Sequence, residues 1–374
     1  MTIARQNWLD STSWQIEFYQ ASVARERKDP EFAWAWMDGY ENHKRRYGDA
    51  ARELVKRTIR RMPIRTRWHD TPYGLDWLRS NHERLWSARC LLEDDLSKIL
   101  FDAHLVLRAT SHRQFYFPRI EFDDLLTLRS ERAFESGDLP RDYLGLPLRV
   151  FDLSMPGRPD VPQLNVVSTR LQIDLLNSYR QYLVRRGNVD FAPSNGEVVM
   201  DCGACIGEVS MVFAGLVGGQ GEVHLFDPVP LHSRYCELQG RMNPSLASAL
   251  RINVMAVGDV SREASGAQSN SDRIAPGGLV IDSFKITTLD DYIEAQKLTR
   301  VDFIKMDIEG AEMAALDGGA KLIGNFKPRL AISAYHKPED LWELPHRMKQ
   351  LNPAYRLFFG HHSPTQLESV YYAA

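Results

Sequence analysis

Short apolar runs recur through the second half of the chain, and amphipathic stretches separate them. The runs predict strands at 197–202, 222–227, 251–257, 301–306, 329–335, 355–361 and 369–373. Helical spacing of apolar residues lies between them, near 207–217, 231–242, 288–297, 311–323 and 339–351. Such alternation is typical of an α/β fold with a mostly parallel sheet. Only the segment 362–368 separates the last two strands, so we expect these to pair antiparallel.

The first part of the chain has a different pattern. Up to about Leu153 the sequence is polar and its apolar residues follow helical spacing. The stretch Met155–Pro162 is rich in proline and breaks any regular element. We therefore predict a helical N-terminal region at 1–155, for substrate selection or oligomerisation, and a second domain at 156–374 that begins with a helix at 169–185. Residues 259–286, rich in serine, glycine and asparagine, are expected to form a lid, a hairpin or a plain surface loop.

Composition narrows the functional classes. The chain has 374 residues and a net charge of -3, with a pI near 6.4, so no global positive charge favours nucleic acid as a partner. No apolar run approaches the ~20 residues of a membrane span, and the N-terminus lacks the apolar core of a signal peptide. Four cysteines without a framework pattern indicate a reducing compartment. We therefore expect a cytoplasmic protein, and a homo-oligomer is left open.

A glycine turn follows the first strand of the predicted sheet. The apolar run Val198–Met200 leads into Asp201, then Gly203 and Gly207, after which a helix begins. Glycine allows close approach of backbone to a ligand, and free N–H groups at a helix N-terminus favour an anionic group such as a carboxylate. The motif D-x-G-x-x-x-G departs from the dinucleotide pattern G-x-G-x-x-G. An acid at Asp201 would repel a pyrophosphate, but it suits the ammonium and sulfonium of S-adenosylmethionine.

The second strand supports a ribose-containing cofactor. Asp227 ends this strand twenty positions after Gly207, where an acid can accept hydrogen bonds from both ribose hydroxyls. We expect the cofactor to contact the glycine turn, the end of this strand and the end of the third strand: Asp201, Cys202, Gly203, Ala204, Gly207, Glu208, Asp227, Pro228, Ala256 and Val257.

Candidate catalytic groups follow the fourth and fifth strands. Asp307 ends the fourth strand, and Glu309 projects to the same side if the strand continues that far. These two carboxylates could hold Mg²⁺ or another divalent cation, orient a substrate hydroxyl or accept its proton. His336 follows the fifth strand and could serve as a base or metal ligand, or cap the next helix. Glu312 is expected only to favour the N-terminus of its helix.

The stretch Val301–Gly319, preceded by Thr287–Tyr292, resembles the signature of the FkbM-type S-adenosylmethionine-dependent methyltransferases. The ending Ile332–Pro338, with Phe359–His362, is similar to the same family, so the resemblance covers roughly 170–374. It implies a Rossmann-like class I methyltransferase sheet and O-methylation of a sugar, glycan or natural-product hydroxyl. Cys205 departs from the asparagine, glycine or aromatic residue that related cofactor loops often carry.

Other interpretations of these features stay open. Cys202 and Cys205 form a C-x-x-C that could be a redox pair or half a zinc site. The whole chain could instead be a nicotinamide-dependent oxidoreductase, or a non-catalytic scaffold that binds partners through its tryptophan-rich helices. Seven of the eight tryptophans precede Leu91, and a basic belt spans 44–67. Aromatic faces and guanidinium groups suit sugar rings and anions, so these helices could wall the acceptor pocket. Alternatively, they pack among themselves with the arginines in water.

Overall fold

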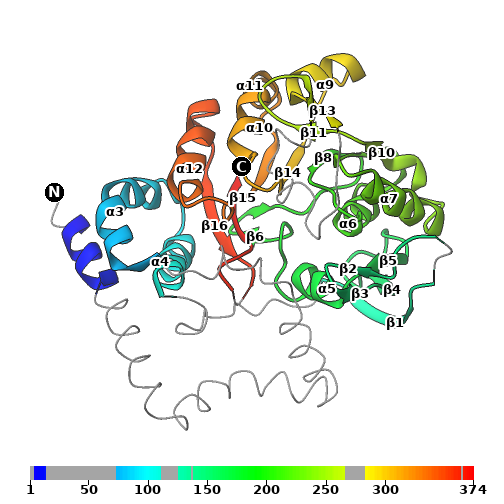
Figure 1. Cartoon of the computed structure of the whole chain (residues 1–374), viewed down its shortest axis with the longest axis horizontal. Coiled ribbons are helices and arrows are strands. Elements are labelled where there is room, and N and C mark those ends of the chain that lie inside the picture. The colour runs from blue at the N-terminus through cyan, green and yellow to red at the C-terminus, as the bar shows by residue number, and fades with distance from the viewer. Residues whose placement is uncertain (1–3, 14–72, 111–124, 136–137, 266–282, 364) are drawn as a thin grey trace, which may run out of the picture.

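The computed structural model describes residues 4–13, 73–110, 125–135, 138–265, 283–363 and 365–374 (Figure 1). The basic belt at 44–67 and the middle of the 259–286 segment lie outside these residues. None of the described helices has both the length and the apolar character that crossing a membrane requires.

A seven-stranded sheet forms the centre of the molecule and confirms the predicted fold class. Its strands lie in the order β10, β9, β8, β14, β15, β17, β16. The first five are parallel, and β17 runs antiparallel to both of its neighbours. The bounds are β8 Val198–Cys202, β9 Glu222–Phe226, β10 Leu250–Asn253, β14 Phe303–Met306, β15 Arg329–Ser333, β16 Leu357–His361 and β17 Ser369–Ala373.

The sheet is buried on both faces because successive side chains of each strand point to opposite sides. Ile304 on β14 belongs to one hydrophobic cluster and the adjacent Phe303 to another. Helices cover both faces: α6 (Glu208–Val217), α7 (Pro230–Met242), α9 (Leu289–Gln296), α10 (Glu312–Gly318), α11 (Ala320–Phe326) and α12 (Asp340–Leu351). The helix predicted at 311–323 is in fact two, α10 and α11, which meet at Gly319.

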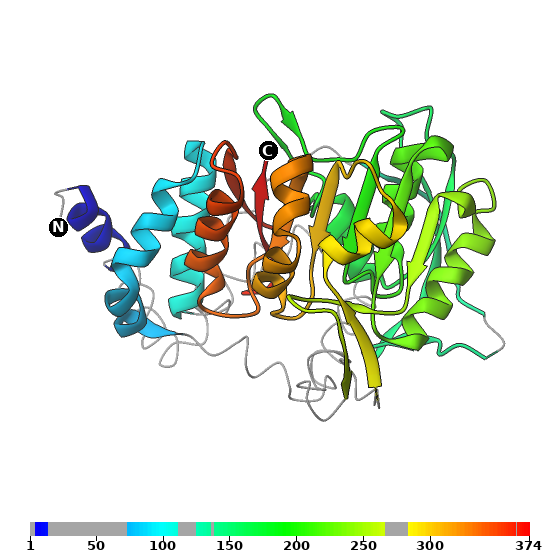
Figure 2. The same ribbon diagram turned by 90° about the horizontal axis from the view of Figure 1, so that it is seen from above.

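The N-terminal helices α3 (Gly74–Cys90) and α4 (Asp95–Thr110) extend the sheet's helical cover at one end of the molecule (Figures 1 and 2). Helix α3 packs on α12, and α4 packs on β16. The described tryptophans contact one another: Trp8 lies 5.4 Å from Trp86, and Trp77 lies 6.5 Å from Trp342, between ring centroids. For these four residues the structure favours a packing role.

Strands lie among the described residues of 127–154, whereas the sequence pattern predicted helices there. A three-stranded antiparallel sheet contains β1 (Thr127–Ala133), β4 (Arg149–Ser154) and β5 (Leu164–Ser168). It packs on α6 and α7 through β5. The proline-rich stretch joins β4 to β5 within this sheet, so hydrogen bonds cross the predicted boundary at 155. The division into two domains there stays a prediction.

Two further predicted elements end early. The helix expected at 169–185 is α5 (Arg170–Asn177), after which β6 (Arg185–Arg186) and β7 (Val189–Asp190) form a short ribbon. The strand expected at 251–257 is interrupted after Asn253, and β11 (Ala256–Val257) pairs instead with β13 (Ser283–Thr287). Strand β12 (Arg262–Ser265) also pairs with β13, antiparallel, so the two described ends of the 259–286 segment lie together.

Candidate functional site

The predicted site residues meet at the carboxyl edge of the parallel strands, and two glycines shape this edge. Gly203 has φ +84°, and a Cβ there would lie 1.8 Å from the carbonyl oxygen of Asp307. Gly207 has φ +88°, and its Cβ would lie 2.9 Å from Cys236 Sγ. Both glycines are therefore required by contacts within the chain. The sequence analysis had assigned them to the approach of a ligand.

Most N–H groups of the glycine turn already have partners. Those of Gly203 and Ala204 donate to the carbonyl oxygen of Phe226 at 2.9 and 3.0 Å, and that of Gly207 donates to Ala204 at 2.9 Å. The N–H of Cys205 donates to Asp227 Oδ2 at 2.9 Å. Of the N–H groups predicted to be free at this helix N-terminus, that of Gly207, the N-cap of α6, is thus used by the protein.

Asp201 is fully buried and forms an ion pair of 2.9 Å with Lys305 Nζ. Ser210 Oγ donates to its other oxygen at 2.5 Å, and Lys305 also donates to the Gly203 carbonyl oxygen at 2.6 Å. Burial lowers the pKa of Lys305, but the carboxylates of Asp201 and Asp307 raise it overall. Because Asp201 is already neutralised, we revise its role from a direct cofactor ligand to a group that holds Lys305.

Glu208 has one oxygen without a partner in the described structure. Its side chain lies in the first turn of α6 and is 3% exposed, and Oε2 accepts no hydrogen bond. Burial raises the pKa of this carboxyl to about 7. A buried oxygen that lacks a donor costs free energy. The ammonium group of a bound amino acid would supply the missing donor, so Glu208 fits the methionyl end of S-adenosylmethionine.

The other predicted cofactor contacts differ in their position and burial. Asp227 lies at the end of β9 with a side chain 12% exposed, and Pro228 follows it in the loop. Ala256 and Val257 lie in β11, where Val257 is buried; their contact with a cofactor stays a prediction.

The C-x-x-C residues form no disulfide. Both thiols are free, and Cys205 Sγ lies 3.1 Å from Tyr143 Oη. Burial raises the pKa of both Cys202 and Cys205. Thiol exchange needs a thiolate, which this burial disfavours, and within the described residues the group that could hold a metal includes neither cysteine. Neither the redox pair nor the half zinc site is therefore supported.

Asp307 accepts two tyrosine hydrogen bonds that the sequence analysis missed. Tyr182 Oη donates to Oδ2 and Tyr335 Oη donates to Oδ1, each at 2.8 Å. Burial by itself raises the pKa of Asp307, but the cations of His336 and Lys305 and these two hydrogen bonds lower it below its usual value. Asp307 is therefore a stable carboxylate that orders its surroundings.

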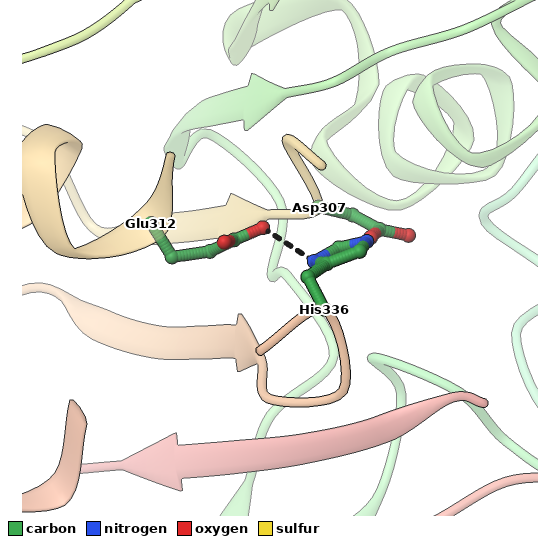
Figure 3. A group of neighbouring side chains, drawn as sticks. All are labelled: Asp307, Glu312 and His336. Atoms are coloured by element: carbon green, nitrogen blue, oxygen red, sulfur yellow. Dashed lines mark ion pairs between the residues drawn. The ribbon is translucent and has the colours of Figure 1, made fainter. Parts of the chain in front are cut away.

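His336 is held between carboxylates (Figure 3). Its Nδ1 lies 2.9 Å from Glu312 Oε1, and its Nε2 lies 3.4 Å from Asp307 and 3.7 Å from Glu309. Burial lowers the pKa of His336, but Glu312, Asp307 and Glu309 raise it to about 10. The side chain is thus a cation at neutral pH and has no free site for a proton, which corrects the expectation that it is a base.

The carboxylate that joins Asp307 and His336 in a compact group is Glu312, not Glu309. The ligand atoms of Asp307, Glu312 and His336 lie within 4.8 Å of one another. Glu312 is fully buried, so its predicted role at a helix N-terminus understates its contacts. Strand β14 ends at Met306, and Glu309 has φ +58° with a side chain 44% exposed. The prediction that a continuing strand aligns Glu309 with Asp307 is wrong.

A further carboxyl group, that of Glu368, is connected to Asp307 through hydrogen bonds of Gln181 and Tyr182. No sequence motif indicated these three residues. Gln181 Nε2 donates to Glu368 Oε2 at 2.5 Å and to Tyr182 Oη at 3.0 Å. Burial and the Asp307 carboxylate raise the pKa of Glu368 to about 7. Tyr182, Glu309 and Glu368 all have positive φ values. Backbone strain of this kind concentrates at functional sites.

Comparison with known proteins supports the family seen in the sequence. Residues 201–357 match the model of the methyltransferase FkbM domain, which confirms the resemblance seen in the sequence. No curated protein matches the sequence significantly.

A solved structure with a TM-score above 0.5 shares the fold, and two further structures named here are less similar. The methyltransferase FkbM of Methylobacillus flagellatus KT has a TM-score of 0.53 and 22% identity, over 81% of this chain and 60% of that chain. This chain therefore spans about 60% of the length of that relative. Fibrillarin of Aeropyrum pernix, solved with bound S-adenosyl-L-methionine, has a TM-score of 0.35 and 9% identity, over 66% of this chain and 99% of that chain. The fibrillarin pre-rRNA processing protein of Methanococcus jannaschii has a TM-score of 0.36 and 11% sequence identity, over 61% of this chain and 89% of that chain.

Proposed function

Because the chain carries a methyltransferase domain of the FkbM family, we propose that it is an S-adenosylmethionine-dependent O-methyltransferase. The proposed acceptor is a hydroxyl of a sugar, glycan or other natural product. When bound, S-adenosylmethionine supplies an activated methyl group, so the protein's main contribution is to align donor and acceptor.

The observation that carries the proposal is the charge of the cofactor edge. Glu208 offers a buried oxygen without a donor, and Asp227 offers a carboxylate at the end of β9. These two acids suit a ligand with an ammonium group and a ribose. Glu208, in the first turn of α6, would repel the pyrophosphate of a nicotinamide cofactor, which the oxidoreductase alternative requires. The family match likewise argues against a non-catalytic scaffold.

The residues around Asp307 have different roles toward the acceptor in this proposal. A hydroxyl is a weak nucleophile until its proton is being removed. We assign this step to Glu368, whose carboxyl titrates near neutrality and lies one glutamine away from Tyr182. Asp307 and Glu309 accept hydrogen bonds from acceptor hydroxyls. The His336 cation stabilises both carboxylates and needs no metal ion to do so.

Cofactor preference tests the proposal directly. S-adenosylmethionine and S-adenosylhomocysteine should raise the melting temperature of the full chain, because a ligand that binds only the folded state stabilises it. NAD should leave the melting temperature unchanged. Glu208→Gln should weaken binding of S-adenosylhomocysteine by about tenfold, the loss expected for one charged hydrogen bond. Glu237→Gln, on the exposed face of α7, is the control. Stabilisation by NAD alone would reject the proposal.

Transfer itself is then measured with methyl-labelled S-adenosylmethionine. Methyl glycosides, which present several hydroxyls on a ring, are the first acceptors to offer. Release of S-adenosylhomocysteine together with label in the sugar supports O-methylation. Label that goes only to an amine or carboxylate acceptor would correct the class of reaction.

A further inference from the structure

The protein itself occupies most of the hydrogen-bonding capacity of Asp227. Its Oδ1 accepts from the Val229 N–H at 2.9 Å and from His232 Nδ1 at 2.9 Å. Its Oδ2 accepts from the Cys205 N–H at 2.9 Å. A carboxylate has about four acceptor sites in total, so only one, on Oδ2, is left for a ligand. Asp227 alone therefore cannot hold both hydroxyls of a ribose, which corrects the expectation from the sequence.

His232 offers the missing acceptor. Its side chain is 3% exposed, and Nε2 has no hydrogen-bond partner among the described residues. The Asp227 carboxylate can only accept, so the hydrogen of the neutral imidazole lies on Nδ1, and Nε2 is an acceptor. A buried polar atom without a hydrogen-bond partner destabilises the folded protein. A ligand hydroxyl at Nε2 would remove this cost.

The surroundings place His232 at the cofactor corner of the edge. It lies in the first turn of α7, directly after the loop that follows Asp227. The Tyr143 ring lies 5.6 Å from the imidazole, and Tyr143 Oη lies 3.1 Å from Cys205 Sγ in the glycine turn. Both free acceptors, Asp227 Oδ2 and His232 Nε2, thus belong to one cluster at the end of β9.

We propose that His232 and Asp227 together bind the ribose diol of the cofactor. One hydroxyl donates to Asp227 Oδ2, and the adjacent hydroxyl donates to His232 Nε2. This inference rests on the proposed function in one respect, that the ligand is an S-adenosyl compound. It assigns a binding residue outside the glycine turn and outside the strand that carries Asp227.

Titration calorimetry on the full chain tests the pairing. The probes are S-adenosylhomocysteine and its 2′-deoxy and 3′-deoxy analogues. The wild type should lose affinity for each analogue, by about tenfold for each lost hydrogen bond. His232→Phe should bind S-adenosylhomocysteine about tenfold more weakly. It should also become indifferent to one of the two hydroxyls while it stays sensitive to the other.

Two further variants separate binding from folding. His224→Phe removes another buried histidine, one that contacts Tyr292, and should keep both hydroxyl effects. His232→Gln keeps a polar side chain and should preserve the melting temperature while it changes the same hydroxyl effect, should the phenylalanine variant not fold. Full sensitivity to both hydroxyls in a folded His232 variant would overturn the inference. A wild type that does not bind S-adenosylhomocysteine would instead reject the proposed function.

Discussion

At the scale of single residues, Lys305 illustrates how buried charges at this sheet edge are paired with one another. Its ammonium group is 3% exposed and lies 2.9 Å from Asp201, while the Tyr182 ring lies 5.4 Å away on the path to Asp307. A buried charge is costly unless it is paired and hydrogen-bonded. Lys305 pairs with Asp201, and the cations of Lys305 and His336 lower the pKa of Asp307, so this edge is a connected network and not a set of independent acids.

The same network leads us to expect that activity does not depend on a divalent metal. A metal on Asp307, Glu312 and His336 would first have to displace the proton of a histidine with a pKa of about 10. At pH 7 that displacement costs ~4 kcal/mol. Excess EDTA should therefore leave both S-adenosylhomocysteine binding and methyl transfer unchanged. Activity that disappears with EDTA and returns with Mg²⁺ would show that a metal replaces the proton.

Glu368 should make the stability of the protein depend on pH. Its pKa is 4.5 in an unfolded chain and about 7 in the fold. Below pH 4.5 the carboxyl is protonated in both states. As the pH rises to about 7, the unfolded state loses its proton first, so the free energy of unfolding falls, by up to ~3 kcal/mol.

Glu368→Gln should remove that fall, so the variant is more stable than the wild type above pH 7 and gains nothing at pH 4. Urea unfolding at several pH values measures the difference. Glu294→Gln, exposed on α9, should follow the wild type throughout. Parallel curves for wild type and Glu368→Gln would contradict both the raised pKa and the proposed role in proton removal.

At the scale of elements, the turn between β8 and α6 is locked to the end of β14. The Asp307 N–H donates to the Cys202 carbonyl oxygen at 3.0 Å, and Gly203 packs directly on Asp307. The glycine turn and the backbone of Asp307 are therefore held together directly. This explains why a glycine is required at 203 even without a bound ligand.

Gly203→Ala should destabilise the protein by at least ~3 kcal/mol, because it combines a strained φ with a collision against backbone. Gly324→Ala is the matched control. It lies inside α11 with no atom within 4 Å of the added Cβ, and should stabilise by about 0.5–1 kcal/mol through helix propensity. Denaturant unfolding distinguishes the two. A Gly203→Ala protein with wild-type stability would show that the turn adapts to a side chain.

At the scale of the whole molecule, an N-terminal helix supports the part of the sheet edge that carries His336 and Glu368. Arg108 on α4 is 1% exposed and donates to the Tyr335 carbonyl oxygen at 3.3 Å and to the Gln366 carbonyl oxygen at 3.2 Å. Gln366 Nε2 donates back to Leu107 at 3.0 Å. Helix α4 thereby holds the two loops that carry His336 and Glu368. That the N-terminal helices form part of the acceptor pocket stays a prediction, and their basic belt at 44–67 lies outside the described residues.

Arg108→Met should loosen these loops while it leaves the fold intact. Methionine fills similar space but leaves the carbonyl oxygens of Tyr335 and Gln366 without this donor, at a cost of about 1–3 kcal/mol for each buried group. Hydrogen exchange should become faster at 333–337 and 365–369 and stay unchanged in α6. Arg84→Met is the control, since Arg84 contacts Trp342 between α3 and α12 without touching the loops. Unchanged exchange in both loops would rule out this coupling.

The sequence by itself determined the parts of this protein that depend on local order. The seven strands of the main sheet were predicted within a few residues, because each is a short apolar run between polar turns. The D-x-G-x-x-x-G turn and Asp227 were located because their chemistry depends on a fixed spacing along the chain. The strands at 127–154 were missed because their pattern shows no clear alternation: every residue of β1 is at least partly exposed, and its pairing with β4 is non-local.

Only the tertiary structure decided what each of these groups does. Asp201 is neutralised by Lys305, His336 is charged by Glu312, and Asp227 is largely occupied by His232 and two N–H groups. The protonation state and remaining capacity of an ionisable group depend on neighbours within a few ångströms. Here those neighbours come from different strands and helices. Tyr182 and Glu368 join Asp307 from positions far apart in the chain, because folding brings three separate loops to one edge of the sheet.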